Sequence, residues 1–270
     1  MKPLQDFPLE ARRAVRGVLC DIDDTLTTGG RLTAAAYGAM ERLQQAGLLV
    51  IPVTGRPAGW CDHIARMWPV DAVVGENGAF YFRYDHATRR MLRRFVDDDA
   101  TRAANRRRLA VIGKEIVAAV PGAAIASDQG YRESDLAIDF CEDVQPLPQS
   151  AIDKIVSLMQ GHGLTAKASS IHVNCWFGAY DKLTMTKTLM RECFDTRLET
   201  ARDTHVFVGD SPNDAPMFAY FPYAIGVANI RDFAGRLAHA PAYVTAQRGG
   251  AGFEEAADAI LAAIGPREQP

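Results

Sequence analysis

The sequence predicts an α/β fold in which a doubly wound parallel sheet carries an inserted α+β module. Three short apolar segments, residues 17–20, 48–53 and 205–208, have the length of strands and are apolar on both faces. Such strands are typical of a parallel sheet that helices cover on both sides. Segments with helical spacing of apolar residues follow them, and this alternation indicates a doubly wound sheet.

Four helices are expected around this sheet. The first starts after Thr33, a plausible N-cap, and runs to about residue 46, where Gly47 suits the position after a helix. The second has Pro57 at its first position and ends near Trp68. The other two span residues 183–194 and 253–264, where apolar residues recur at helical spacing.

The middle of the chain, from about residue 88 to 179, has a different order of helix, strand, strand, helix, strand, strand. Apolar and polar residues alternate along its strands, as they do when one face of a sheet packs on helices and the other is open. The expected helices are residues 99–120 and 148–161, and the expected strands are residues 123–127, 135–141, 164–168 and 171–176. We therefore expect a core formed by residues 1–86 and 181–270, with residues 87–180 as a cap.

Composition excludes several classes of protein. With 48% hydrophobic and 23% charged residues, the 270-residue chain is neither disordered nor fibrous. Its net charge of −3 gives no general attraction to nucleic acid or to anionic membranes. The first 17 residues lack the apolar segment of a signal peptide, and five scattered cysteines without CxxC spacing indicate reduced thiols. We expect a cytoplasmic monomer or small homo-oligomer.

Polar and acidic residues follow each of the three predicted strands, at residues 21–25, 54–57 and 209–214. In an open parallel sheet, ligands bind beyond these carboxyl ends of the strands. Carboxylates that converge there repel one another unless a cation is present, and oxygen ligands favour Mg²⁺. A site of this kind suits phosphoryl transfer, in which a carboxylate can act as the nucleophile.

Four motifs resemble those of the haloacid dehalogenase-like (HAD) superfamily: DIDDT at 21–25, VTGRP at 53–57, GENGA at 75–79 and GDSPND at 209–214. The last of these carries Pro212, which removes one N–H from the motif. The resemblance extends from about Val15 to the end of the chain. Within the superfamily the sequence is similar to class IIB, in which the cap lies between the second and third motifs. It implies a Rossmann-like core with a C2B cap of αββαββ order. Members of that class include Cof-type sugar phosphatases, sucrose-phosphate and mannosyl-phosphoglycerate phosphatases, and phosphomannomutases.

The resemblance implies a role for each matching residue. Asp21 is the expected nucleophile, and Asp23 the expected general acid and base, whose backbone carbonyl also binds Mg²⁺. The Thr54 hydroxyl is expected to hold the transferring phosphoryl group. Asp210 is the expected Mg²⁺ ligand, and Asp214 binds the metal directly or through water, or orients the lysine. Asp21, Asp23, Asp210 and Asp214 together form the expected metal site.

The lysine of the third motif has two candidates. Lys182 lies at a predicted helix start after the cap and fits the motif best, whereas Lys187 lies inside that helix and favours a solvated role. Three further residues are expected near the substrate: Gly55, Arg56 and Asn213. Arg56 can equally pair with an acid. In the GENGA segment, Glu76 and Asn77 line the edge of the site, or Gly75, Asn77 and Gly78 simply form a turn.

The open face of the cap sheet is expected to lie over the site. Strand alternation places polar residues on that face, although for Asp139 and Thr165 simple exposure to solvent is preferred. The candidates for substrate recognition are Arg132, Lys167, Ser169, His172 and Asn174.

These features predict a Mg²⁺-dependent phosphatase that hydrolyses a small phosphorylated metabolite, a sugar phosphate in the first instance, through an aspartyl-phosphate intermediate. A phosphomutase that uses the same nucleophile is the alternative. A glycosyltransferase with Asp21 and Asp23 as its DxD motif and a non-catalytic sensor are less favoured. No nucleic-acid or membrane partner is expected.

Overall fold

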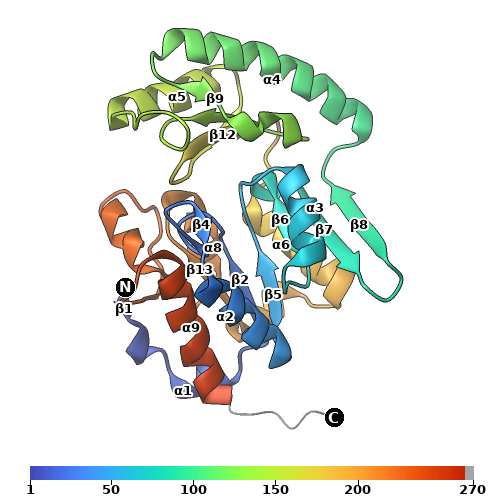
Figure 1. Ribbon diagram of the computed structural model, residues 1–270, viewed down its shortest axis with the longest axis vertical. Helices are drawn as coiled ribbons and strands as arrows, with labels where there is room; N and C mark the ends of the chain where they lie inside the picture. The colour runs from blue at the N-terminus through green and yellow to red at the C-terminus, as the bar shows by residue number, and fades with distance from the viewer. Residues whose placement is uncertain (265–270) are drawn as a thin grey trace.

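A computed structural model describes residues 1–264 of the chain and divides it into a core and a cap (Figure 1). The core contains a parallel sheet of six strands in the order β1-β15-β14-β13-β2-β5. The strands of this sheet are β1 (Lys2–Pro3), β2 (Gly17–Cys20), β5 (Leu49–Pro52), β13 (His205–Gly209), β14 (Ile225–Gly226) and β15 (Tyr243–Val244). The predicted doubly wound parallel sheet is therefore confirmed.

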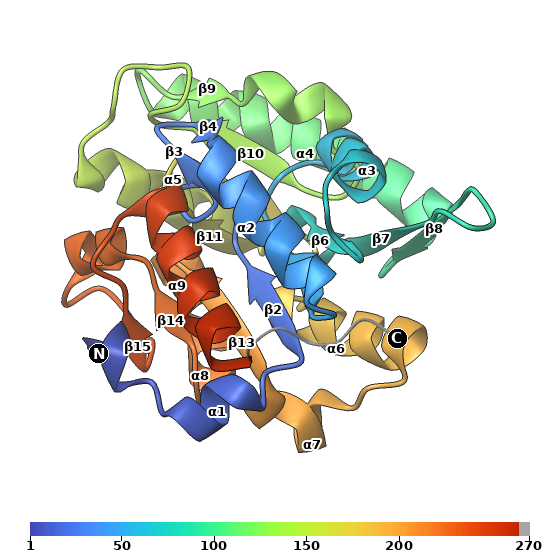
Figure 2. The same ribbon diagram turned by 60° about the horizontal axis from the view of Figure 1, so that its bottom comes forward.

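Helices cover both faces of this sheet (Figure 2). Along β2, Val18 and Cys20 pack in a cluster that includes residues of α2, α3 and α9, while Leu19 packs with α6 and α8 on the opposite face. The strand β2 is thus buried on both sides, which explains its unbroken apolar sequence. The core helices are α1 (Leu9–Arg13), α2 (Ala34–Gln45), α3 (Ala58–Met67), α6 (Lys182–Phe194), α7 (Leu198–Ala201), α8 (Ala215–Tyr220) and α9 (Gly249–Ile264).

Two small sheets extend the core. The strands β3 (Thr27–Thr28) and β4 (Arg31–Leu32) form a hairpin after β2, and a bridge between Val53 and Val74 joins the main sheet to an antiparallel sheet of three strands. These three strands are β6 (Val73–Gly75), β7 (Phe80–Asp85) and β8 (Arg90–Phe95). None of these three strands was predicted from the sequence. The boundary expected at residue 87 falls in the hairpin that joins β7 to β8. The strand β8 pairs with β7, so α4 is the first element of the cap.

The cap is an antiparallel sheet of four strands, in the order β11-β12-β10-β9, with two helices on its outer face. Its elements are α4 (Asp99–Ala119), β9 (Ala124–Ile125), β10 (Leu136–Asp139), α5 (Gln149–Gly161), β11 (Thr165–Ala168) and β12 (His172–Trp176). On β12, Val173 and Cys175 pack against the helices. His172 and Asn174 therefore lie on the face that meets the core, as the alternation predicted.

Helix starts follow the local chemistry closely. The Thr33 hydroxyl accepts a hydrogen bond from the Ala36 N–H at 3.2 Å and caps α2 as expected. Pro57 stands one position before α3 rather than within it, and α9 begins four residues earlier than its apolar spacing indicated. Among residues 1–264, no helix combines the length and apolar character that crossing a membrane requires.

Candidate active site

Three segments meet at the carboxyl ends of the parallel strands. Asp21 follows β2, the loop with Asp210 and Asp214 follows β13, and Lys182 is the first residue of α6. The Lys182 Nζ lies 2.7 Å from Asp21 Oδ1 and 2.7 Å from Asp214 Oδ1, and all three side chains are buried. Lys182 therefore occupies the predicted position, whereas Lys187 faces away toward Glu199, 3.5 Å from its carboxylate.

The charges of this cluster perturb one another strongly. Burial raises the pKa of Asp21 to about 7, because desolvation outweighs the attraction of Lys182. Burial, together with the neighbouring carboxylates of Asp21 and Asp214, also raises the pKa of Asp210. Burial alone lowers the pKa of Lys182, but Asp21 and Asp214 more than offset this and raise it above its ordinary value. The lysine is therefore a permanent cation.

The loop after β13 is folded by its own residues. Ser211 and Asp214 form a capping box around the short turn Pro212–Asp214, in which Pro212 occupies a first-turn position that needs no N–H donor. Gly209 lies so close to Asp214 that a Cβ there would stand 2.4 Å from Asp214 Oδ2. The glycine thus gives the Asp214 carboxylate room to fold back, where it accepts the Asp210 N–H at 3.2 Å.

The acidic cluster fits a divalent cation. Ligand atoms of Asp21, Asp210 and Asp214 all lie within 4.8 Å of one another. Asp210 also accepts hydrogen bonds from the Thr25 hydroxyl at 3.4 Å and from Asn229 Nδ2 at 3.2 Å. When all three carboxylates are ionised, the one buried ammonium leaves two negative charges uncompensated, and a bound cation would offset them. An all-oxygen donor set of this charge is suited to Mg²⁺.

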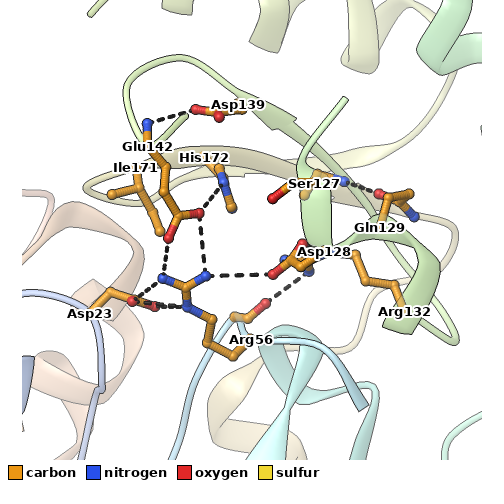
Figure 3. A network of polar contacts seen from close by, with 12 residues as sticks. Asp23, Arg56, Ser127, Asp128, Gln129, Arg132, Asp139, Glu142, Ile171 and His172 are labelled. Carbon is orange, nitrogen blue, oxygen red and sulfur yellow. Dashed lines mark hydrogen bonds and ion pairs between the residues drawn. The ribbon is translucent and has the colours of Figure 1, made fainter. Parts of the chain in front are cut away.

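Asp23 lies in a second charged cluster (Figure 3). Arg56, which follows β5, donates two hydrogen bonds to the Asp23 carboxylate. Its Nε lies 2.9 Å and its Nη2 2.7 Å from Asp23 Oδ1. The Arg56 guanidinium is also 2.6 Å from Glu142 and 3.5 Å from Asp128, both in the cap. Thr54 is fully buried in the same loop, where its hydroxyl accepts the Arg56 N–H at 3.0 Å. Arg56 thus joins the core to the cap.

Glu142 was not among the predicted site residues. Its carboxylate also lies 2.9 Å from His172 Nε2, and the pairing with His172 and Arg56 lowers its pKa to about 2 although burial acts in the opposite direction. Asp139 holds the loop in place by accepting N–H groups of residues 141–143 at 2.8–2.9 Å. Asp139 is 1% exposed, so the solvent-exposed role preferred for it was wrong.

The structure places some of the remaining cap candidates at the site and one of them, Lys167, away from it. Ser169, His172, Asn174 and Arg132 border the site together with Gly55, Arg56 and Asn213 of the core. Arg132 is wholly engaged, by Asp128, by Asp135 and by the Gly55 carbonyl at 2.9 Å. Asn174 donates to Asp135 at 2.9 Å. Lys167 is exposed on β11 and does not line this cavity, because it belongs to the outermost strand of the cap sheet.

The space between core and cap is narrow directly above Asp21 and Asp23. The residues that border the site, with Asp21 and Asp23 at its floor, enclose a cavity of about 10 Å³, room for a single water molecule. A second cavity of about 370 Å³ adjoins it, and Asp23, Arg56 and Ile171 line both. Glu142 lines only the larger one. This inner cavity is smaller than a phosphoryl group, so we expect substrate entry to require a movement of the cap.

The GENGA segment forms a turn with a buried polar side chain. Glu76, Asn77 and Gly78 all have positive φ, and a Cβ on Gly78 would stand 2.0 Å from the Asp181 carbonyl oxygen, so the turn packs tightly against the start of α6. Glu76 is 0% exposed and accepts hydrogen bonds from core and cap backbone. The turn that was one of the two alternatives is therefore present, and the contact that Glu76 makes between core and cap was not predicted.

Comparisons with known proteins agree with this architecture. The sequence model of the haloacid dehalogenase-like hydrolases matches residues 18–104. No curated protein sequence matches the chain. Among solved structures, the C-terminal domain of Candida albicans trehalose-6-phosphate phosphatase has a TM-score of 0.68 at 13% identity, covering 96% of this chain and 98% of that one.

Two further structures share the fold over nearly their whole length. A Thermoplasma acidophilum protein has a TM-score of 0.66 at 17% identity, with 89% of this chain and 96% of that one covered. The sucrose-phosphatase of Synechocystis sp., solved with sucrose and phosphate, has a TM-score of 0.61 at 15% identity, with 92% and 98% covered. The residues that this family model matches include the motifs at 21–25, 53–57 and 75–79 and the start of the cap, so this part of the chain is similar to the haloacid dehalogenase-like hydrolases.

Proposed function

We propose that the protein is a Mg²⁺-dependent phosphatase that hydrolyses a small phosphorylated metabolite through an aspartyl-phosphate on Asp21. The observation that carries this proposal is the contact of Lys182 with both Asp21 and Asp214, at 2.7 Å each, beside Asp210. A nucleophilic carboxylate, a fixed cation and a site for a divalent metal are the parts that phosphoryl transfer requires.

The chain's own residues divide the reaction among them. Asp21 attacks phosphorus, and the bond from phosphorus to the leaving oxygen breaks. Asp23, two residues later, delivers a proton to that oxygen and afterwards accepts one from the water that hydrolyses the aspartyl-phosphate. Lys182 offsets negative charge on Asp21 and on the phosphoryl group, and the buried Thr54 hydroxyl is the candidate to hold that group.

Asp21, Asp210 and Asp214 would hold the Mg²⁺ ion, together with the backbone carbonyl of Asp23. When bound, the ion neutralises charge on the phosphoryl oxygens. The two uncompensated charges of the cluster support a divalent rather than a monovalent cation.

A sugar phosphate is the substrate class we propose. The cap face that closes over Asp21 presents hydrogen-bonding groups, His172, Asn174 and Ser169, to a small enclosed space. Such a surface suits a compact polyhydroxylated molecule, and cap closure excludes water from the site. Trehalose-6-phosphate phosphatase and sucrose-phosphatase, which share the fold, act on molecules of this class as their names state.

The test is phosphate release by the purified protein with Mg²⁺ across a panel of phosphorylated metabolites. The panel contains hexose phosphates, disaccharide phosphates, glycosyl phosphoglycerates, nucleotides and p-nitrophenyl phosphate. We expect one sugar phosphate to be hydrolysed with the highest kcat/KM. No release from any ester would contradict the proposal, and isomerisation of a sugar phosphate that depends on a bisphosphate would identify the alternative, a phosphomutase.

A further inference from the structure

We propose that Glu76 is a positioning residue that fixes the cap loop of residues 132–135 to the core loop carrying Thr54 and Arg56. It acts through those loops and touches neither substrate nor metal. The inference deepens the proposed phosphatase function and rests on it for the kinetic part of its test only.

The Glu76 carboxylate is shared between core and cap. Its Oε1 accepts the N–H of Ala58 at 3.0 Å and that of Glu133 at 2.9 Å. Its Oε2 accepts the N–H of Ser134 at 2.6 Å and that of Asp135 at 3.2 Å. Because all four partners are donors, only a carboxylate satisfies them, and an amide would turn its own N–H₂ toward two of them.

Its core partner belongs to the loop that follows β5. Ala58 is the first residue of α3, two positions after Arg56. The Glu76 N–H in turn donates to the Arg56 carbonyl at 3.1 Å, and the Asn77 N–H donates to the Thr54 carbonyl at 3.0 Å. The turn that carries Glu76 therefore supports the backbone of both Thr54 and Arg56.

Its cap partners connect to the wall of the site. Arg132, at the start of the cap loop, donates to the Gly55 carbonyl at 2.9 Å and makes a second link between the same two loops. Asp135, at its end, accepts from Asn174, which borders the inner cavity. A shift of this cap loop would thus carry Asn174 away from Asp21.

Burial distinguishes the Glu76 link from the contact between Glu142 and Arg56, which also joins core and cap. Glu76 is 0% exposed, whereas the side chain of Glu142, which meets Arg56, is 26% exposed. A substrate has to displace the cap, and the solvent-edge contact is the easier one to break. The Glu76 link then persists and returns the polar face to the same place over Asp21.

The backbone at this position points to a use for the side chain. Glu76 has φ of 43° and Asn77 has φ of 56°, left-handed conformations that glycine adopts at less cost. Strain of this kind is retained where the surroundings depend on it. Here the turn directs a buried carboxylate at four N–H groups.

The first test is native-state hydrogen exchange without substrate, on wild type, Glu76→Gln and a matched control, Glu133→Gln. The control removes a carboxylate that pairs outward with Arg106 while its N–H still faces Glu76. We expect Glu76→Gln to speed exchange at the amides of residues 133–135 by about tenfold or more, with β2 and β13 unchanged. Unchanged protection of those amides would overturn the proposal.

A second variant keeps the test decisive if Glu76→Gln fails to fold. Glu76→Asp retains the charge but shortens the reach, so we expect faster exchange at residues 133–135 with β2 and β13 still protected. If both variants fold and protect the cap loop as wild type does, the proposal is wrong. None of these exchange outcomes depends on activity, so they stand apart from any failure of the proposed function.

The kinetic test uses the preferred ester of the panel and p-nitrophenyl phosphate. We expect Glu76→Gln to raise KM for the preferred ester by about tenfold, while kcat/KM for the small ester changes by less than about threefold. A purely structural role predicts equal losses on both esters. Such equal losses would contradict positioning even where hydrogen exchange has changed.

Discussion

Asp21 and Asp23 are two residues apart on one loop, yet each carboxylate faces a different cation. Asp21 meets Lys182 in a cluster that is wholly buried and formed by core residues alone. Asp23 meets Arg56, which is shared with Glu142 and Asp128 of the cap. The comparison separates two tasks. In the proposed mechanism the core cluster carries out the chemistry on phosphorus. The second cluster connects the Asp23 carboxylate, through Arg56, to two carboxylates of the cap.

The largest expected effect tests the core cluster. Asp21→Asn removes the nucleophile, so we expect phosphate release to fall by at least about 10⁴-fold. Steady-state assays with the best ester measure this. The control is Asp203→Asn, an exposed residue outside both clusters, which should retain full activity. Substantial turnover by Asp21→Asn would mean that Asp21 is not the nucleophile.

Lys182→Met tests how much the Lys182 ammonium stabilises the same cluster of buried carboxylates. The change leaves Asp21 and Asp214 buried without their partner, which we expect to cost about 3–5 kcal/mol in the free energy of unfolding. Urea unfolding measures it. Lys187→Met is the matched control on the same helix, and its partly exposed pair with Glu199 should be worth less than about 1 kcal/mol. Equal losses for the two variants would remove the distinction.

Metal binding sharpens the account of the core cluster. A divalent ion that binds only the folded protein stabilises it by about 2.7 kcal/mol at 100 times its Kd. We expect Mg²⁺ to raise Tm and EDTA to abolish turnover reversibly, while Asp210→Ala loses the Tm increase. The ion relieves the uncompensated charge of three carboxylates. A Tm that does not respond to Mg²⁺ in wild type would contradict the site.

Glu142→Gln tests the cluster shared with the cap. The variant weakens the contact that a substrate must break, while Arg56 keeps its bonds to Asp23. A partly exposed ion pair stabilises the closed cap by up to about 1 kcal/mol. Because substrate no longer has to break this pair in the variant, KM for p-nitrophenyl phosphate should fall by roughly threefold. Glu115→Gln, on the outer helix of the cap, is the control. A KM that is unchanged or raised would show that this contact does not limit entry.

The pH dependence of that contact is the smallest effect. The pKa of Glu142 lies at about 2 in the folded protein, below its ordinary value of 4.5. The contact therefore makes its full contribution to the free energy of unfolding above pH 4.5. This contribution is lost as the pH falls toward 2. We expect the Tm difference between wild type and Glu142→Gln to shrink from pH 5 to pH 3. A difference that stays constant across this range would contradict the pairing.

The two clusters also differ in how far the sequence predicts them. Asp21, Asp210 and Asp214 follow strands of one parallel sheet, whose carboxyl ends meet by geometry, and Lys182 begins the next helix. The partners of Arg56 depend on how the cap docks, which no local pattern encodes. Glu142 lies in an irregular loop after β10, so its sequence gave no sign that it would face Arg56.

Some elements were missed for related reasons. Half of the residues of β8, RMLRRF, are charged and most are exposed, and their order lacks the apolar alternation that identifies a strand. The strands β14 and β15 have two residues each, too few for any periodicity. Arg132 was predicted to meet substrate because a basic residue in a cap loop suits an anion. Its burial against Asp128 and Asp135 uses that charge within the fold instead.

The proposed mechanism depends most on the covalent step at Asp21, and phosphorylation of that residue can be measured directly. The protein is mixed with Mg²⁺ and a saturating amount of its best ester, quenched in acid within one turnover and digested for mass spectrometry. We expect the peptide containing Asp21 to gain one phosphoryl group and to lose this label on the time scale of phosphate release. Phosphate released within the first turnover without any label on that peptide would contradict it.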